Sequence, residues 1–141
     1  MKRELVAALI IKESKILLVH NIKHGLRIEP PGGKIEIGET SENAIKRELN
    51  EELDIDVVPI SHFGDYNTAS DEGEFSVKMY ICEIIKGEPQ IPESEQDKIK
   101  EFRWYSFDEI DELARKGILA PNLQEALPKL RKLFKLSLYP N

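Results

Sequence analysis

The stretch from residue 30 to residue 55 limits what this chain can fold into more than any other part of the sequence. It opens with two prolines, Pro30 and Pro31, followed directly by Gly32 and Gly33. Proline fixes φ and biases the preceding residue away from helix, so the chain must arrive here in an extended conformation. The glycine pair then allows either a close approach of the backbone to a ligand or a turn with positive φ.

A helix is predicted over residues 41–53, with Thr40 as its N-cap. Glu48, Glu51 and Glu52 stand at i, i+3 and i+4, so they share an arc of about 100° on this helix. The neighbouring arc is apolar and predicted to face the core: Ile45, Leu49 and Leu53. Like charges at this spacing repel one another, and a bound cation would remove the repulsion. Carboxylate oxygens suit Mg²⁺ or Mn²⁺, although a solvated acidic face is the alternative for the helix taken alone.

Composition excludes several classes of protein. With 141 residues the chain (1–141) is expected to form a single domain. Its net charge of −6 argues against a general affinity for nucleic acid, and an anionic substrate would need a local cation to approach. Cys82 is the only cysteine, so neither an intrachain disulfide nor a zinc site built from cysteines is expected. The apolar run at residues 5–11 is predicted to be a first strand rather than a signal peptide, which favours a cytoplasmic location without membrane contact.

The rest of the sequence predicts a mixed α/β domain. Apolar runs predict strands over residues 5–11, 15–20, 54–63, 75–85 and 101–105. Helices are expected over residues 107–116 and 122–136, and polar loops over residues 67–74 and 86–98. Strands interrupted by one early helix and followed by two late ones favour a mixed β-sheet covered on both faces, an α/β/α sandwich.

The spacing within the opening stretch resembles the Nudix box. Gly33 is followed after five residues by Glu39, and after seven more by Arg47-Glu48-Leu49, with Glu51-Glu52 and Asp54-Ile55 completing the pattern. One position departs from the family, because Asp54 stands where glycine is expected. That glycine normally ends the helix in a left-handed conformation, which aspartate tolerates at a cost of about 1 kcal/mol.

This resemblance implies the Nudix-type α/β/α sandwich and a role for each matched residue. Glu48, Glu51 and Glu52 would bind the metal, with the carbonyl of Gly32 as a backbone ligand. Arg47 would hold and orient these glutamates. The remaining matched positions are Gly33, which would approach the substrate, and Glu39, which would fix the glycine loop to the helix.

Two further residues are assigned from the family pattern outside the box. Its general base is either a glutamate of the helix or one from a distant loop, where Glu93, Glu95 and Asp97 are available and Glu95 is favoured. Pro121-Asn122 resembles the segment of MutT-like enzymes whose asparagine reads the purine base. An amide can both donate to and accept from a base edge, but Asn122 would also serve as a plain N-cap.

The resemblance implies a Mg²⁺-dependent pyrophosphohydrolase, with Mn²⁺ as a second usable metal. The expected reaction converts a nucleoside triphosphate, with an oxidised purine nucleotide as one candidate, into a nucleoside monophosphate and pyrophosphate. An ADP-ribose or nucleotide-sugar pyrophosphatase is the first alternative, although Asp71 stands where that branch tends to have proline. A regulatory Nudix module without turnover is the second. The expected partner is a small nucleotide rather than nucleic acid; the general base, the number of metal ions and a homodimer stay open.

Overall fold

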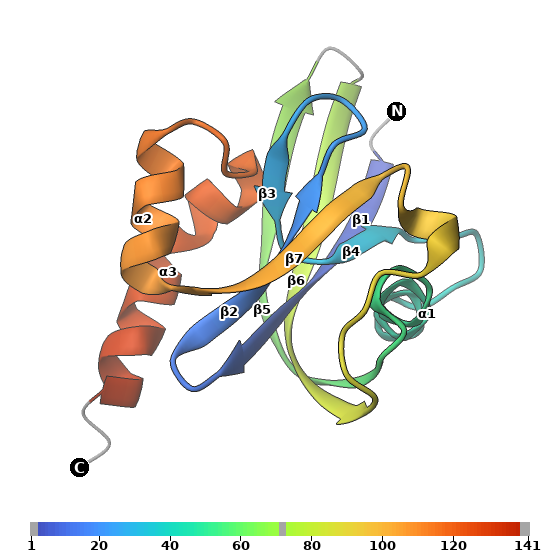
Figure 1. The fold of residues 1–141 in the computed structure, drawn as a ribbon, viewed down its shortest axis with the longest axis horizontal. Coiled ribbons are helices and arrows are strands. Elements are labelled where there is room, and N and C mark those ends of the chain that lie inside the picture. The colour runs from blue at the N-terminus through green and yellow to red at the C-terminus, as the bar shows by residue number, and fades with distance from the viewer. Residues whose placement is uncertain (1–2, 71–72, 139–141) are drawn as a thin grey trace.

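The computed structural model describes residues 3–70 and 73–138, which form a mixed sheet with helices on both sides (Figure 1). The strands are β1 (Arg3–Lys12), β2 (Lys15–Asn21), β3 (Arg27–Glu29), β4 (Gly32–Lys34), β5 (Asp56–Ser70), β6 (Gly73–Lys86) and β7 (Ile99–Ser106). The helices are α1 (Ser41–Leu53), α2 (Phe107–Arg115) and α3 (Pro121–Leu138), with a short 3₁₀ turn, η1 (Glu93–Glu95). No helix in the described part of the chain is both long and apolar enough to span a membrane.

Strand β1 lies at the centre of the sheet and organises its two faces. It pairs in parallel with β6 and antiparallel with β4 and β2, so the predicted mixed sheet is confirmed. Its side chains alternate as a two-faced strand requires. Val6 and Ala8 pack with α1, whereas Ala7 and Leu9 pack in the cluster that contains α2 and α3. Figure 1 shows α1 on one side of the sheet and the other two helices on the opposite side, which confirms the α/β/α sandwich.

Helix α1 has the boundaries and the buried face that the sequence predicts. The Thr40 hydroxyl accepts a hydrogen bond from the backbone N–H of Asn43 at 3.1 Å, as an N-cap does. The apolar stripe is fully buried: Ile45, Leu49 and Leu53 are each 0% exposed. Asp54 ends the helix with φ 55° and ψ 39°, and its N–H donates to the carbonyl of Asn50. The left-handed end that the sequence places at Asp54 is confirmed.

The loop predicted over residues 67–74 is wrong for the residues that the structure describes. Strand β5 continues to Ser70 and β6 begins at Gly73, and the two stay paired from Asn67↔Ser76 to Ser70↔Gly73. Backbone pairing with β6 keeps the polar end of β5 extended, so the polarity of its side chains does not interrupt the strand. The position singled out at Asp71 lies outside the described residues.

Candidate active site

The glycine pair lies in β4, where its lack of side chains lets α1 and β1 approach. Gly32 pairs with Ala7, and Gly33 pairs with Val6. A Cβ atom on Gly32 would lie 2.0 Å from the Val6 carbonyl oxygen, and one on Gly33 would lie 2.3 Å from Cδ of Glu48. Neither glycine has positive φ, so the turn interpretation is wrong. The close approach is made to the chain's own β1 and to the Glu48 carboxylate.

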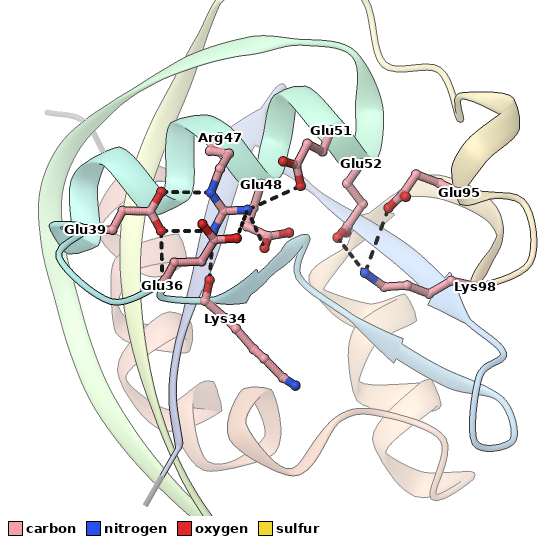
Figure 2. Close-up of polar contacts among 9 residues, drawn as sticks. All are labelled: Lys34, Glu36, Glu39, Arg47, Glu48, Glu51, Glu52, Glu95 and Lys98. Atoms are coloured by element: carbon pink, nitrogen blue, oxygen red, sulfur yellow. Dashed lines mark hydrogen bonds and ion pairs between the residues drawn. The ribbon is translucent and has the colours of Figure 1, made fainter.

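Arg47 connects the glycine strand, the following loop and helix α1 (Figure 2). Its Nε and Nη2 atoms donate to the two carboxylate oxygens of Glu39 at 2.7 and 2.9 Å, and Nη2 also donates to the Lys34 carbonyl at 2.9 Å. Its Nη1 donates to Glu48 at 3.0 Å and to Glu51 at 3.2 Å. The hydrogen bonds from Arg47 lower the pKa of Glu39 to about 2. The guanidinium therefore sets the direction of two of the helix carboxylates.

Glu52 differs from the other helix glutamates because it is buried. Its side chain is 2% exposed, and in the described part of the structure its Oε2 atom accepts no hydrogen bond. The Lys98 ammonium forms an ion pair with that oxygen, with Nζ 3.7 Å away. Burial raises the pKa of Glu52 to about 8, although the Lys98 charge and the Gly32 amide oppose the shift. A buried carboxylate oxygen without a hydrogen-bond donor, as Oε2 is here, is costly unless a cation compensates it.

The helix glutamates are adjacent, but within the described residues they do not converge on one point. No group of three or more His, Cys, Asp or Glu side chains there is arranged to hold a metal ion. Glu48 and Glu51 turn toward Arg47, whereas Glu52 turns toward Lys98 (Figure 2). Their chemistry nevertheless fits a hard divalent cation, because Glu52 supplies a buried oxygen to which no described residue donates a hydrogen bond.

A cavity of about 520 Å³ opens beside this cluster. Glu48 and Glu51 line it together with Gly32 and Gly33, and Asn122 from α3 lines it as well. Its wall also carries a set of basic side chains from separate elements: Arg3, Lys23, Arg27, Lys34 and Lys98. Arg47 is a sixth cation of this wall and four glutamates lie on it as well, so an anionic ligand would meet more cations than carboxylates there.

Asn122 lies in the first turn of α3. The helix begins at Pro121, and the Ala120 carbonyl accepts from the N–H groups of Leu123 and Gln124 at 3.1 and 3.0 Å. The N-cap interpretation of Asn122 is therefore wrong. Its Oδ1 atom is buried, and among the described residues it has no hydrogen-bond partner. That Asn122 reads a base stays a prediction. Its Oδ1 is an acceptor available for it, on a residue that lines the cavity.

The loop that carries Glu95 is attached to the end of α1. The backbone N–H of Gln90 donates to the Leu53 carbonyl at 3.0 Å, and its side chain donates to Asp54 at 2.6 Å. Glu95 itself lies in η1, and its Oε1 is 3.9 Å from Nζ of Lys98. Lys98 links it to Glu52 of α1, but Glu95 is outside the set of residues that line the cavity.

Sequence reasoning missed Lys98, which the structure places between the helix and the Glu95 loop. The available signal was its position three residues after Glu95, the one lysine in an acidic polar segment after Lys86. It also missed His24 and Phe75, which line the cavity from the β2–β3 connection and from β6. Neither was recognisable, because only the folded sheet brings residues so distant in sequence to one wall.

The family model for the NUDIX domain matches residues 1–130. The chain belongs to the Nudix family. The family resemblance predicted from the sequence is thus confirmed. The segment from Gly33 to Ile55 is the Nudix box of this chain.

Relatives of known name agree with this membership. A NAD-capped RNA hydrolase NudC from Mannheimia succiniciproducens is 31% identical over 123 residues, which span 82% of this chain and 44% of that protein. An 8-oxo-dGTP diphosphatase from Escherichia coli K12 is 38% identical over 63 residues, which span 45% of this chain and 49% of that protein. The matched region is thus less than half the length of these curated relatives.

Solved structures share the fold. The MutT protein from Methanosarcina mazei Go1 superposes with a TM-score of 0.79 at 20% identity, covering 93% of this chain and 94% of that chain. The E. coli ORF135 protein superposes with a TM-score of 0.73 at 26% identity, covering 94% of this chain and 90% of that one. The Nudix α/β/α sandwich therefore extends over nearly the whole sequence.

Proposed function

We propose that this Nudix chain is a Mg²⁺-dependent pyrophosphohydrolase that converts a nucleoside triphosphate into a nucleoside monophosphate and pyrophosphate. The observation that supports this most is the shared cavity. Carboxylates of α1 and Asn122, whose Oδ1 accepts no hydrogen bond from the described residues, line the same space of about 520 Å³, together with six Lys and Arg side chains. A nucleotide needs those three features together: a metal site, cations for its phosphates and a polar group for its base.

In this proposal the α1 carboxylates hold the metal. Glu48, Glu51 and Glu52 are its side-chain ligands, the Gly32 carbonyl is its backbone ligand, and Mn²⁺ can replace Mg²⁺. When bound, the metal ion makes water more acidic and neutralises charge on the phosphoanhydride. Arg47 keeps Glu48 and Glu51 in place through the hydrogen bonds it already donates to them.

Glu95 is proposed to accept the proton of the attacking water. Its loop is tied to the C-terminal end of α1 through Gln90, so the carboxylate has a defined position relative to the metal ligands. A general base must come within hydrogen-bond reach of the water, directly or through a second water. The 3.9 Å from its Oε1 to Nζ of Lys98, which also faces Glu52, is consistent with that role.

Asn122 is proposed to read the base. The buried Oδ1 can accept from a base N–H, while the amide nitrogen can donate to a ring nitrogen or carbonyl. An oxidised purine is a reasonable target, because oxidation at C8 adds both a carbonyl and an N–H to the purine edge. The similarity to an 8-oxo-dGTP diphosphatase supports testing that substrate first.

A second candidate is cleavage of the pyrophosphate in NAD or in a NAD-capped RNA. The observation that favours it is the likeness to NAD-capped RNA hydrolases, which extends over 82% of this chain. The basic side chains on the cavity wall suit the phosphates of either class. We favour the free nucleotide because the net charge of −6 opposes general RNA binding.

The cytoplasmic location stays a prediction.

A substrate panel at fixed Mg²⁺ tests the proposal. It contains the common nucleoside triphosphates, 8-oxo-dGTP, ADP-ribose, a nucleotide sugar, NAD and a NAD-capped RNA, and kcat/KM ranks them. The proposal expects the highest value for a nucleoside triphosphate, with Glu52→Gln inactive on every member. A highest value for NAD or NAD-capped RNA would select the second candidate, and a lack of turnover on the whole panel would indicate the regulatory module.

A further inference from the structure

Lys98 faces one carboxylate from α1 and one from η1 (Figure 2). Its Nζ lies 3.7 Å from Oε2 of Glu52 on α1 and 3.9 Å from Oε1 of Glu95 in η1. Both distances allow ion pairing but exceed those of a good N–H···O hydrogen bond. The ammonium is therefore held by charge between two acids rather than locked by directed hydrogen bonds.

The backbone of Lys98 is fixed, whereas its side chain has room to move. Its N–H donates to the Glu95 carbonyl at 3.0 Å, and its carbonyl accepts from Ile22 at 2.9 Å. The side chain is 37% exposed and lines the cavity beside Glu48 and Asn122. A flexible four-carbon stem on a fixed backbone can move its charge by several ångströms within that space.

The Lys98 ammonium is surrounded by carboxylates. Besides Glu52 and Glu95, the carboxylates of Glu48 and Glu29 lie near enough to interact with it electrostatically. A divalent cation bound at Glu52 would neutralise the acids that now attract Lys98, and would repel the ammonium. The same cavity would then offer it another anion, the phosphate of a bound nucleotide. Lysine binds phosphate as a compact charge without strict geometry.

We propose that Lys98 is a phosphate-contacting catalytic residue that pairs with Glu52 and Glu95 until a metal ion is bound at Glu52, and then turns to a substrate phosphate. This rests on the proposed function, because it requires a phosphorylated substrate in the cavity. It has a distinctive consequence. Lys98 competes with the metal and also assists the reaction, so its removal strengthens metal binding and weakens turnover at the same time. A residue that only supports the fold would weaken both.

The test compares Lys98→Met with Lys100→Met, which removes an exposed lysine two positions along β7. Isothermal titration calorimetry without nucleotide gives the Mg²⁺ dissociation constant, and steady-state kinetics on the best substrate of the panel gives kcat and KM. We expect Lys98→Met to bind Mg²⁺ about three- to tenfold more tightly and to lose about tenfold or more in kcat. Lys98→Arg keeps the charge, so it should bind Mg²⁺ within about twofold of wild type and regain part of kcat. Lys100→Met should change neither quantity.

Unchanged or weaker Mg²⁺ binding by Lys98→Met would overturn the proposal, as would an unchanged kcat. Circular dichroism verifies folding, and Lys98→Gln replaces the methionine variant if that variant does not fold. The calorimetric comparison needs no substrate. If wild type hydrolyses nothing in the panel, the proposed function and the phosphate contact both fail, whereas the competition between Lys98 and the metal is still decided.

Discussion

Arg47 and Glu39 form a bidentate ion pair, with Nε 2.7 Å from Oε2 and Nη2 2.9 Å from Oε1. The same guanidinium donates to the Lys34 carbonyl, to Glu48 and to Glu51. Only a planar group with several fixed N–H donors can make these contacts together. The pair therefore does more than join a loop to a helix: it leaves Nη1 aimed at two of the carboxylates proposed to bind the metal.

Arg47→Lys should impair the site, although it conserves charge. A lysine ammonium cannot make the five hydrogen bonds that the guanidinium donates. We therefore expect kcat/KM to fall by about tenfold or more, with weaker Mg²⁺ binding. Steady-state kinetics and calorimetry measure the two effects. Arg115→Lys is the matched control, because Arg115 donates to Glu112 at 2.7 Å on the exposed side of α2, outside the cavity lining. Equal activity of Arg47→Lys and wild type would contradict the orienting role.

Gly33→Ala should damage the site while leaving the fold nearly intact. The added Cβ would lie 2.3 Å from Cδ of Glu48, the far end of a side chain that can move aside. The carboxylate would then leave its position, and we expect Mg²⁺ binding to weaken by about tenfold or more. The comparison is Gly32→Ala, whose Cβ would meet the Val6 carbonyl at 2.0 Å and so disrupt β1–β4 pairing. Thermal unfolding should show a large loss of Tm for Gly32→Ala only; an equal loss in both variants would argue against this reading of Gly33.

The stability of the metal-free protein should fall as pH rises, because of Glu52. Burial raises the pKa of this carboxyl from an ordinary 4.5 to about 8 in the folded state. Above pH 4.5 the unfolded chain releases the proton while the folded chain retains it, so stability declines until about pH 8. Below pH 4.5 both states are protonated and the full contribution is present.

Unfolding in EDTA at pH 5 and at pH 8 measures this decline. Glu52→Gln cannot ionise, so its Tm should drop less between the two pH values than that of wild type. Mg²⁺ should restore wild-type stability at pH 8 more than that of the variant, because a ligand that binds only the folded state stabilises it. Parallel curves for both proteins would remove Glu52 as the source of the pH dependence.

Asn122→Ala should alter which base is accepted more than how fast the anhydride is cleaved. Removing the amide deletes a donor and an acceptor on the cavity wall, so we expect kcat/KM for the preferred nucleotide to fall by about tenfold or more. The ratio of kcat/KM for the preferred nucleotide to kcat/KM for a nucleotide with a poor base should move toward one. Gln124→Ala, two residues further along the exposed side of α3, is the control. A uniform loss across all bases would assign Asn122 a structural role instead.

The box was the part of the molecule most open to prediction from sequence, because its information is local. Thr40 caps α1, Leu49 is buried and Asp54 takes φ 55° as the spacing requires. The cap and the left-handed helix end depend on residues a few positions apart, and the burial of Leu49 was indicated by the helical spacing of the apolar residues. By contrast, the extended hairpin through Ser70 depends on pairing with β6, and nothing in its polar side chains reveals that partner.

The same distinction applies to the candidate site. Helical spacing placed Glu48, Glu51 and Glu52 together, but it did not reveal that Glu52 alone is buried. That burial arises where α1 packs on β4, a contact between segments separated by a loop. Lys98 lies further still along the chain, and it meets Glu52 because β7 pairs with β2 and the Ile22 N–H donates to the Lys98 carbonyl.

The most direct measurement follows the products of one nucleoside triphosphate, incubated with Mg²⁺, by ³¹P NMR, for wild type and Glu52→Gln. The proposed function predicts a nucleoside monophosphate and pyrophosphate in equal amounts from wild type, with turnover lower by orders of magnitude in the variant. A nucleoside diphosphate and inorganic phosphate as products, or equal turnover by the two proteins, would contradict it.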